Sequence, residues 1–266
     1  MITSATNPKV KAVVKLRTAR ERARTGHILI DGARAVAMTE GRGMTLIEAF
    51  WCPQEASQEE HDLAQRLAEA DIPVQPVAPG AFKKMAYGDG PDRLLVVAER
   101  PATALDALSP PDPALVLVVE GVEKPGNLGA LLRTADAAGA HGVIVCDPAC
   151  DPYGPNVVRA SRGTVFSVPM AVAGAEEIVP WLHKNGIVLI AATPDGTVPY
   201  TKAALDQPCA IALGAEHAGV SEVLRAAAAQ RVSLPMRGAA DSLNVSVTGA
   251  VLLYEALRRR DERDSR

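Results

Sequence analysis

Short apolar runs alternate with helical patterns along most of the chain, and this alternation is the strongest constraint on its fold. The clearest unit covers residues 115–145, with an apolar run, a glycine-bearing loop, a helical pattern and a second apolar run. Strands that alternate with helices form mostly parallel sheets covered by helices on both faces. Apolar residues make up 48% of the chain and aromatic residues only 3%, so Val, Leu, Ile and Ala must form most of the core. The sequence therefore predicts an α/β fold.

A proline-rich stretch over residues 100–115 divides this alternation into two parts. It contains four prolines, and Pro110, Pro111 and Pro113 cannot occupy a helix interior or a central strand. The 266 residues are enough for two domains of ordinary size. We predict a first domain over residues 1–100, a linker over 101–113 and a second domain over 114–266.

The expected elements follow from hydrophobic periodicity and from helix-end signals. Ser57 and Glu60 have the spacing of a capping box at the start of one helix. In the first domain we expect helices over residues 7–24, 32–39 and 57–70, and strands over 28–31, 46–51, 74–77 and 94–98. In the second domain we expect strands over residues 115–119, 142–146, 165–168, 187–191 and 210–213, and a long final helix over 243–260.

The first expected helix is strongly basic, although the net charge of the chain is −3. It can be an ordinary solvated face or a surface that contacts phosphate groups. Long cations contact phosphate oxygens without reading a base sequence. The lack of aromatic residues here argues against base stacking as the main mode of binding. The cations are Lys9, Lys11, Lys15, Arg17, Arg20, Arg22 and Arg24, against a single acid, Glu21.

The glycine-bearing loop that follows the apolar run of residues 115–119 does not have the spacing of a dinucleotide site. Its glycines are Gly126 and Gly129, without the third glycine of G-x-G-x-x-G, and the P-loop lysine pattern is absent. A nicotinamide-dependent oxidoreductase is therefore disfavoured. Asn127 can be a helix N-cap. Arg133, in contrast, follows a glycine loop at the end of a strand, where open α/β sheets usually bind ligands.

Two later stretches repeat this arrangement. Residues 211–224 form another predicted strand, glycine loop and helix, and the loop contains Glu216 and His217. Residues 234–259 place the polar triplet Ser-Leu-Asn at the start of an apolar helix, with Ser242 as a candidate N-cap. Three such loops near strand ends are unlikely to carry polar residues only for capping.

These three stretches together resemble a known family. NLGALLRTA, LGAEHAGV and LPMRG followed by SLNVSV are similar to the signature motifs of the SpoU (TrmH-type) RNA ribose 2′-O-methyltransferases of the SPOUT superfamily. TSATNPKVKAVVKL and IDGAR resemble the L30e-like substrate-binding domain of that family. RASRGTVFSVP is similar to the thiostrepton-resistance branch and also to ordinary ribosomal RNA members.

The resemblance implies an α/β fold with two parts: a small L30e-like domain, and a C-terminal SPOUT domain whose mostly parallel sheet ends in a trefoil knot. It implies a homodimer formed through the knotted domain and S-adenosylmethionine as cofactor. The implied catalytic residues are Arg133, Asn127, Asn244 and Glu216. The implied cofactor contacts are Leu213, Gly214, Leu234, Met236, Leu243, Asn244, Val245 and Thr193. The candidate RNA contacts are Lys9, Lys11, Lys15, Arg34 and Arg162.

The function implied is S-adenosylmethionine-dependent 2′-O-methylation of a ribose in RNA, with 23S ribosomal RNA as the favoured substrate. Transfer RNA, or RNA binding without chemistry, are the alternatives. Arg133 can act as a base or as an electrostatic clamp, and a guanidinium that stays protonated favours the clamp. Glu216 can be catalytic or structural. The second motif reads GAE where many relatives have GNE, so any role of that asparagine is in doubt.

No metal site or membrane span is expected. The four cysteines, Cys52, Cys146, Cys150 and Cys209, form no CxxC pair and have no histidine pair to complete a zinc set. We expect reduced thiols and a cytoplasmic protein. The N-terminus has no apolar signal segment, and no apolar run approaches the length of a membrane span.

Overall fold

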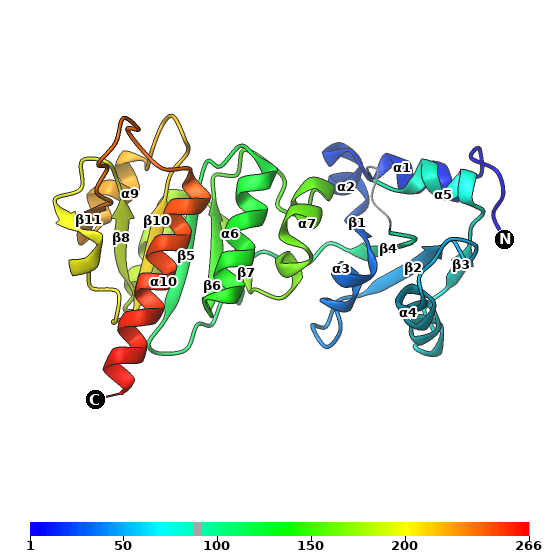
Figure 1. Ribbon diagram of the computed structural model, residues 1–266, viewed down its shortest axis with the longest axis horizontal. Coiled ribbons are helices and arrows are strands. Elements are labelled where there is room, and N and C mark those ends of the chain that lie inside the picture. The colour runs from blue at the N-terminus through cyan, green and yellow to red at the C-terminus, as the bar shows by residue number, and fades with distance from the viewer. Residues whose placement is uncertain (88–91, 266) are drawn as a thin grey trace. The chain divides into compact units, whose positions relative to one another are not determined.

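The computed structural model describes residues 1–87 and 92–265 and divides into two compact units (Figure 1). The first unit comprises Met1–Pro101 together with Tyr153–Ser167. The second comprises Ala102–Pro152 and Val168–Arg266. No helix in the described part of the chain is both long enough and apolar enough to cross a membrane.

The first unit is built on a mixed four-stranded sheet. The strands lie in the order β1-β4-β2-β3, with β4 antiparallel to both β1 and β2 and with β3 parallel to β2. Its elements are α1 (Pro8–Lys15), α2 (Ala19–Thr25), β1 (His27–Asp31), α3 (Ala33–Ala37), β2 (Leu46–Trp51), α4 (Gln58–Glu69), β3 (Val74–Pro76), α5 (Pro79–Met85), β4 (Leu94–Glu99), α7 (Pro155–Ser161) and the 3₁₀ turn η2 (Thr164–Phe166).

Side chains that alternate along the strands fill a core on each face of this sheet. On one face, Leu29, Phe50 and Leu95 pack with residues of α1 and α5, such as Val10 and Phe82. The helices α3 and α4 contact the strands separately from that cluster. The capping box at the start of α4 is confirmed, because Ser57 and Glu60 bond reciprocally.

The single basic helix expected over residues 7–24 is wrong. The chain forms α1 and α2, because Thr18 has extended backbone angles and its hydroxyl accepts a hydrogen bond from Glu21 N, which starts a new helix. The break changes what the cations do. Arg22 is only 3% exposed and donates to the Leu16 carbonyl. Arg17 donates to the last carbonyls of α5, including Lys84 O at 2.8 Å.

The second unit contains a seven-stranded sheet in the order β7-β6-β5-β10-β8-β11-β9, and every pairing in it is parallel. The predicted parallel α/β architecture is therefore confirmed. Its elements are η1 (Leu105–Ala107), β5 (Leu115–Glu120), α6 (Pro125–Ala137), β6 (Gly142–Cys146), β7 (Met170–Ala173), α8 (Ala175–Lys184), β8 (Val188–Ala192), β9 (Val198–Pro199), η3 (Tyr200–Lys202), β10 (Cys209–Leu213), α9 (Glu222–Ala227), β11 (Gln230–Ser233) and α10 (Val245–Asp264).

Helices cover both faces of this sheet. On one face, Ile178 and Trp181 of α8 and Leu224 of α9 pack against strand residues such as Val116 and Val118. On the other face, the C-terminal helix α10, red in Figure 1, packs along α6 and β10. The α10 backbone packs directly on leucine side chains there, because a Cβ added at Gly249 would lie 2.4 Å from Leu131 Cδ2 and 2.9 Å from Leu213 Cδ1.

The strand expected over residues 165–168 is wrong. Thr164–Phe166 form the turn η2, and the strand β7 begins later, at Met170. Val165 and Phe166 are buried, but they belong to the first unit rather than to the parallel sheet. Gly163, with φ +87°, lets the backbone lie against α3, since a Cβ there would be 2.7 Å from the Ala35 Cα. The segment Tyr153–Ser167 is thus part of the first unit, although the second unit precedes and follows it in the sequence.

Candidate functional site

Four loops meet at the carboxyl edge of the parallel sheet. They follow β5, β8, β10 and β11, and because β10 lies between β5 and β8, segments far apart in the sequence become neighbours. This edge is the usual ligand site of open parallel sheets. The three stretches singled out in the sequence, which carry Asn127, Glu216 and Asn244, all reach it.

A chain of hydrogen bonds joins these three side chains. Asn127 donates its amide to one oxygen of the Glu216 carboxylate, and Lys124 forms an ion pair with the other. Asn244 donates from Nδ2 to Asn127 Oδ1 at 3.3 Å. Asn244 Oδ1 in turn accepts from the backbone N of Ser246 at 2.9 Å. The predicted set therefore comes together with each amide orientation fixed by its partners.

The structure places the N-caps of α6 and α10 at residues other than those suggested by the sequence. Asn127 is not the N-cap of α6, because the helix begins at Pro125 and Lys124 occupies the cap position. The N-cap of α10 is Asn244 rather than Ser242. The Asn244 side chain therefore both caps a helix and bonds Asn127.

Glu216 is ionised in this arrangement. The hydrogen bond from Lys124, followed by its charge and the bond from Asn127, lowers the pKa of the Glu216 carboxyl. An ionised carboxylate only accepts hydrogen bonds. It therefore requires that Asn127 present its NH₂ group to Glu216 and its carbonyl oxygen to Asn244.

Arg133 lies on α6, the helix that carries Asn127, and is exposed. In the described part of the chain it has no hydrogen bond or ion pair of its own, whereas many of the other arginines do. The structure does not bring this guanidinium into the bonded set of Asn127, Glu216 and Asn244, and it remains available to an anionic or polar substrate.

A cavity of about 830 Å³ opens beside the network. This volume lies within the usual range for small-molecule sites. Of the predicted cofactor contacts, its lining includes Thr193, Leu234, Met236, Leu243, Asn244 and Val245, and it also includes Glu216. Leu213 and Gly214 are not among the lining residues. Gly214 allows close packing instead, since a Cβ there would lie 2.0 Å from the Gly219 carbonyl carbon.

The residues around this cavity fit a nucleoside-bearing ligand. Its walls combine apolar side chains such as Leu234, Met236 and Val245 with a few polar groups, as ligand pockets usually do. The Thr193 hydroxyl is buried beside it without a hydrogen-bond partner among the described residues.

Comparison with known proteins identifies the family. Residues 114–254 match the SpoU rRNA Methylase family, and residues 7–96 match the MRM3-like substrate binding domain. The chain belongs to the SpoU rRNA methylase family. The family prediction made from the three motifs is confirmed.

Individual relatives agree over nearly the whole chain. The 23S rRNA (uridine(2479)-2′-O)-methyltransferase of Streptomyces viridochromogenes is 31% identical over 90% of this chain and 85% of its own length. A crystal structure of an RNA 2′-O ribose methyltransferase has a TM-score of 0.85 at 40% identity, covering 97% of this chain and 98% of that chain. The SpoU methyltransferase AviRb from S. viridochromogenes, in complex with the cofactor AdoMet, has a TM-score of 0.87 at 30% identity, covering 96% and 98%.

Three residues of this SpoU site were not anticipated from the sequence. Lys124 lacks a motif role and is recognisable only through its ion pair with Glu216. Arg225 lines the cavity from α9 and holds Asp195 at 2.7 Å. Glu120, at the end of β5 and 7% exposed, accepts from Ser221 N at 2.7 Å and so fixes the far end of the second-motif loop. An acid at the end of an otherwise apolar strand is the one signal that was visible in the sequence.

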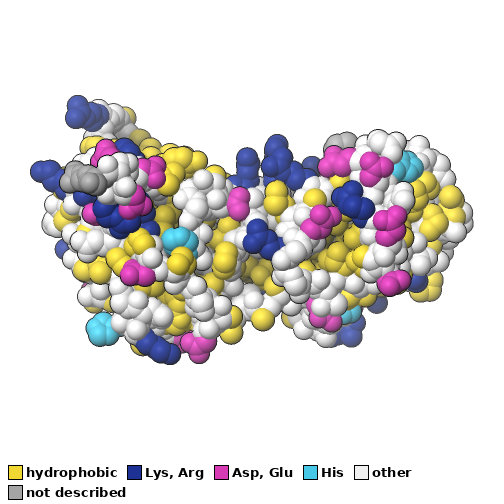
Figure 2. Space-filling view, turned by 90° about the horizontal axis from the view of Figure 1, so that it is seen from below, with side chains coloured by type: hydrophobic (Ala, Val, Ile, Leu, Met, Phe, Trp, Pro, Cys, Tyr) yellow, Lys and Arg dark blue, Asp and Glu magenta, His cyan; other side chains and the backbone are white. Residues whose placement is uncertain are grey.

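The predicted RNA contacts all belong to the first unit. Lys11 and Lys15 are exposed on α1, whereas Lys9 forms an ion pair with Glu48. Arg34 and Arg162 are both exposed. They lie near each other, because Gly163 packs against Ala35. The face shown in Figure 2 carries acidic and basic side chains interspersed rather than one continuous basic surface.

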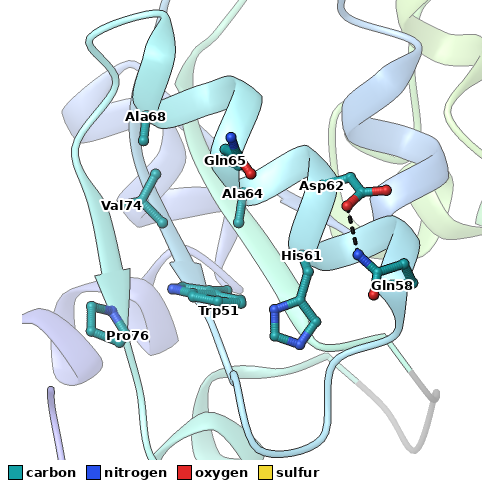
Figure 3. A pocket seen from close by; sticks show the side chains of 9 residues that line it. All are labelled: Trp51, Gln58, His61, Asp62, Ala64, Gln65, Ala68, Val74 and Pro76. Atoms are coloured by element: carbon teal, nitrogen blue, oxygen red, sulfur yellow. Dashed lines mark hydrogen bonds between the residues drawn. The ribbon is translucent and has the colours of Figure 1, made fainter.

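A second hollow, of about 580 Å³, lies in the first unit between α4 and strands β2 and β3 (Figure 3). Trp51 and His61 meet edge to face in it, with ring centroids 4.8 Å apart, and Gln58 donates to Asp62 at 2.7 Å. None of the predicted site residues lines this hollow.

Proposed function

We propose that this protein transfers a methyl group from S-adenosylmethionine to a ribose 2′-hydroxyl in RNA, with 23S ribosomal RNA as its substrate. The observation that carries the proposal is the bonded set Asn127, Glu216 and Asn244 beside the 830 Å³ cavity, with Arg133 free on the same helix as Asn127. Membership of the SpoU rRNA methylase family and the similarity to a 23S rRNA 2′-O-methyltransferase support the same activity.

The reaction needs an aligned hydroxyl and a means of losing its proton. S-adenosylmethionine supplies an electrophilic methyl group on a sulfonium when it is bound. Asn127 has one amide hydrogen and one carbonyl lone pair beyond those that Glu216 and Asn244 use, so it can hold a ribose hydroxyl. Asn244 fixes the angle of that amide.

Arg133 serves as an electrostatic clamp. Its guanidinium stays protonated in proteins and so is a poor base, but it can hold a phosphate oxygen and stabilise negative charge that develops on the 2′-oxygen. Water or the RNA itself then takes the proton. Arg133→Lys keeps the charge and loses the planar fork, so we expect turnover to fall by about 100-fold with the affinity for cofactor unchanged.

The cavity described above would hold the cofactor. Thr193, Leu234, Met236, Leu243 and Val245 line it and would contact the cofactor when it is bound. The close approach of Gly214 to Gly219 shapes the second-motif loop next to it. The AdoMet complex of AviRb, which is similar over nearly the whole chain, supports this assignment.

The two parts of the chain divide the work. Residues 1–100, together with Tyr153–Ser167, bind the RNA substrate, residues 101–113 connect, and the rest of residues 114–266 carries out methyl transfer. The match of residues 7–96 to a substrate binding domain supports the first role. Lys11, Lys15, Arg34 and Arg162 are exposed and can contact phosphate groups.

The chain end forms a trefoil knot, and two copies pair through it. The path of the chain supports the knot: after β11, near one end of the sheet, it returns so that α10 packs on α6 and β10. Leu243, Val247 and Tyr254 support the dimer, because their large apolar side chains are 39%, 47% and 50% exposed. Tyr254→Glu should give a monomer in sedimentation equilibrium, and a wild-type monomer would contradict the pairing.

The decisive experiment incubates the purified protein with radiolabelled S-adenosylmethionine and transcribed 23S ribosomal RNA or transfer RNA. We expect label in 23S RNA only, blocked when the target ribose is a 2′-deoxyribose. Mass spectrometry of the digested RNA then identifies the nucleotide. Label in transfer RNA would show that transfer RNA is the substrate instead of 23S RNA. Cofactor binding without methyl transfer to either RNA would favour an RNA-binding protein without chemistry.

A further inference from the structure

The two faces of the sheet in the first unit are covered by helices of opposite charge. Phe50 of β2 packs with residues of α1 and α5, whereas its neighbour Trp51 lines the hollow beside α4. Since neighbouring residues of a strand point to opposite faces, α1 and α5 cover one face of the sheet and α4 covers the other (Figure 1). The charge of the unit can therefore be compared face by face.

The face covered by α1 and α5 is basic. Neither helix contains an acidic residue. The exposed cations are Lys11 and Lys15 of α1 and Lys83 and Lys84 of α5. None of these four ammonium groups has a hydrogen bond or an ion pair with another described residue. They are therefore available for phosphate oxygens, which long cations contact without reading a base sequence.

Arg17 brings the lysine-bearing ends of the two helices together. It follows α1, and its guanidinium donates to Lys84 O at 2.8 Å and to Met85 O at 3.0 Å, at the end of α5. Lys15 lies in the last turn of α1, and Lys83 and Lys84 lie in the last turn of α5. The free carbonyls at a helix end carry partial negative charge. Because the guanidinium offsets that charge at α5, the end of the helix pair is positive.

The acids near α1 do not cancel this charge. Arg24 holds the Glu21 carboxylate through bonds of 3.0 and 2.6 Å. Glu48 of β2 forms an ion pair with Lys9, which removes that lysine from the set of free cations. Each of these two acids is thus balanced by a cation of its own, and the four free lysines remain.

The α4 face is acidic instead. Glu59, Asp62 and Glu69 are exposed along α4. The single arginine of this helix, Arg66, forms an ion pair with Glu40 at 3.4 Å. The described residues that line the hollow beside α4 include Asp62 and neither Lys nor Arg. A phosphate backbone would be repelled from this face and attracted to the opposite one.

We propose that the RNA backbone crosses the face formed by α1 and α5, with Lys83 and Lys84 as phosphate contacts beside Lys11 and Lys15, and that the α4 face stays clear of RNA. This inference rests on the proposed function, which assigns RNA binding to the first unit. The match to a substrate binding domain over residues 7–96 includes both helices. Lysines hold phosphates as point charges, so this face supplies affinity and orientation whichever nucleotide is methylated.

The test measures how binding of transcribed 23S ribosomal RNA to the whole protein depends on salt, by filter binding with S-adenosylhomocysteine present. Each phosphate contact adds about 0.7–0.9 to the slope of log affinity against log salt. The double variant Lys83→Gln, Lys84→Gln should therefore lower that slope by about 1.5, and weaken binding at about 0.1 M salt by about tenfold. The KM for RNA should rise, with turnover at saturating RNA unchanged.

The double variant Lys184→Gln, Lys202→Gln is the matched control, because both lysines are exposed in the second unit and the net charge changes equally. It should keep the wild-type slope, and melting temperatures check that both variants are folded. An unchanged slope in the α5 variant would overturn the inference. An equal fall in the control would also overturn it, since net charge alone would then explain the effect. If the wild-type protein bound RNA with the expected slope but methylated none, the proposed function would fail instead.

Discussion

The contact between α10 and α6 gives a sharp prediction for Gly249→Ala. The new Cβ would lie 2.4 Å from Leu131 Cδ2 and 2.9 Å from Leu213 Cδ1. Carbon atoms in contact sit about 3.5–4.0 Å apart. Both leucines are buried in a close-packed interior, where side chains have little room to retreat. Either the two leucine side chains turn, or α10 moves away from α6 and β10 by about 1 Å, and the close packing favours the movement of α10.

The effect on stability should be small, and the effect on catalysis large. Overpacking costs about 1–3 kcal/mol, but alanine is favoured over glycine in a helix by about 1 kcal/mol. We therefore expect a loss of about 0–2 kcal/mol in the free energy of unfolding. The same shift moves Asn244, which caps α10, away from Asn127 on α6, across a bond of 3.3 Å. A displacement of about 1 Å can lower turnover by about 100-fold.

Two measurements test this reasoning. Urea unfolding gives the stability, and label transfer to 23S RNA at saturating cofactor gives turnover. Gly126→Ala is the matched control for stability, because it makes the same change on the facing helix and its Cβ would meet nothing within 4 Å. Turnover of Gly249→Ala within twofold of wild type would refute the argument that these helices fix the amide pair.

Three further predictions concern charged groups. Burial raises the pKa of the Asp31 carboxyl from 3.8 to about 6, so the folded protein binds this proton more tightly than the unfolded chain does. The resulting stabilisation is fully present below pH 4 and is lost as the pH rises through 6. Asp31→Asn should therefore stabilise more at pH 7.5 than at pH 4, by up to about 3 kcal/mol in urea unfolding, and equal effects would contradict this. Arg260, only 8% exposed, donates to several backbone carbonyls, including Pro113 O at 2.7 Å. Arg260→Met should cost about 3–5 kcal/mol, and a loss below about 1 kcal/mol would show that those carbonyls find other donors. Lys124 lowers the pKa of Glu216, so in Lys124→Met the loss of turnover on the acid side of the pH profile should occur at higher pH. An acid side that does not move would show that turnover does not require ionised Glu216.

Elements with a strong physical signal could be predicted from the sequence. The runs that became β5, β6 and β10 are continuous and apolar because both faces of those strands are buried. The strands β9 and β11 gave no such signal, since they are short and Val232 is the only fully buried residue among them. Val165 and Phe166 gave a false strand, because their burial comes from packing in the first unit.

Only the residues of the candidate site that belong to the sequence motifs could be predicted. Asn127, Glu216 and Asn244 carry motif positions, and the structure brings them together. Lys124 and Arg225 carry no such pattern. Their place depends on the order of strands in the sheet, which puts β10 between β5 and β8, and periodicity does not encode that order.

The placement of Tyr153–Ser167 has a consequence for how the protein is made. A ribosome that has released the first hundred residues has not yet produced α7, whose contacts with β1 complete the first unit. The first unit therefore remains incomplete while β5, α6 and β6 are synthesised. Neither unit corresponds to one continuous piece of the gene, so a cut at the proline-rich stretch yields two incomplete fragments. Recombination between relatives would have to exchange two separate segments to move either unit whole.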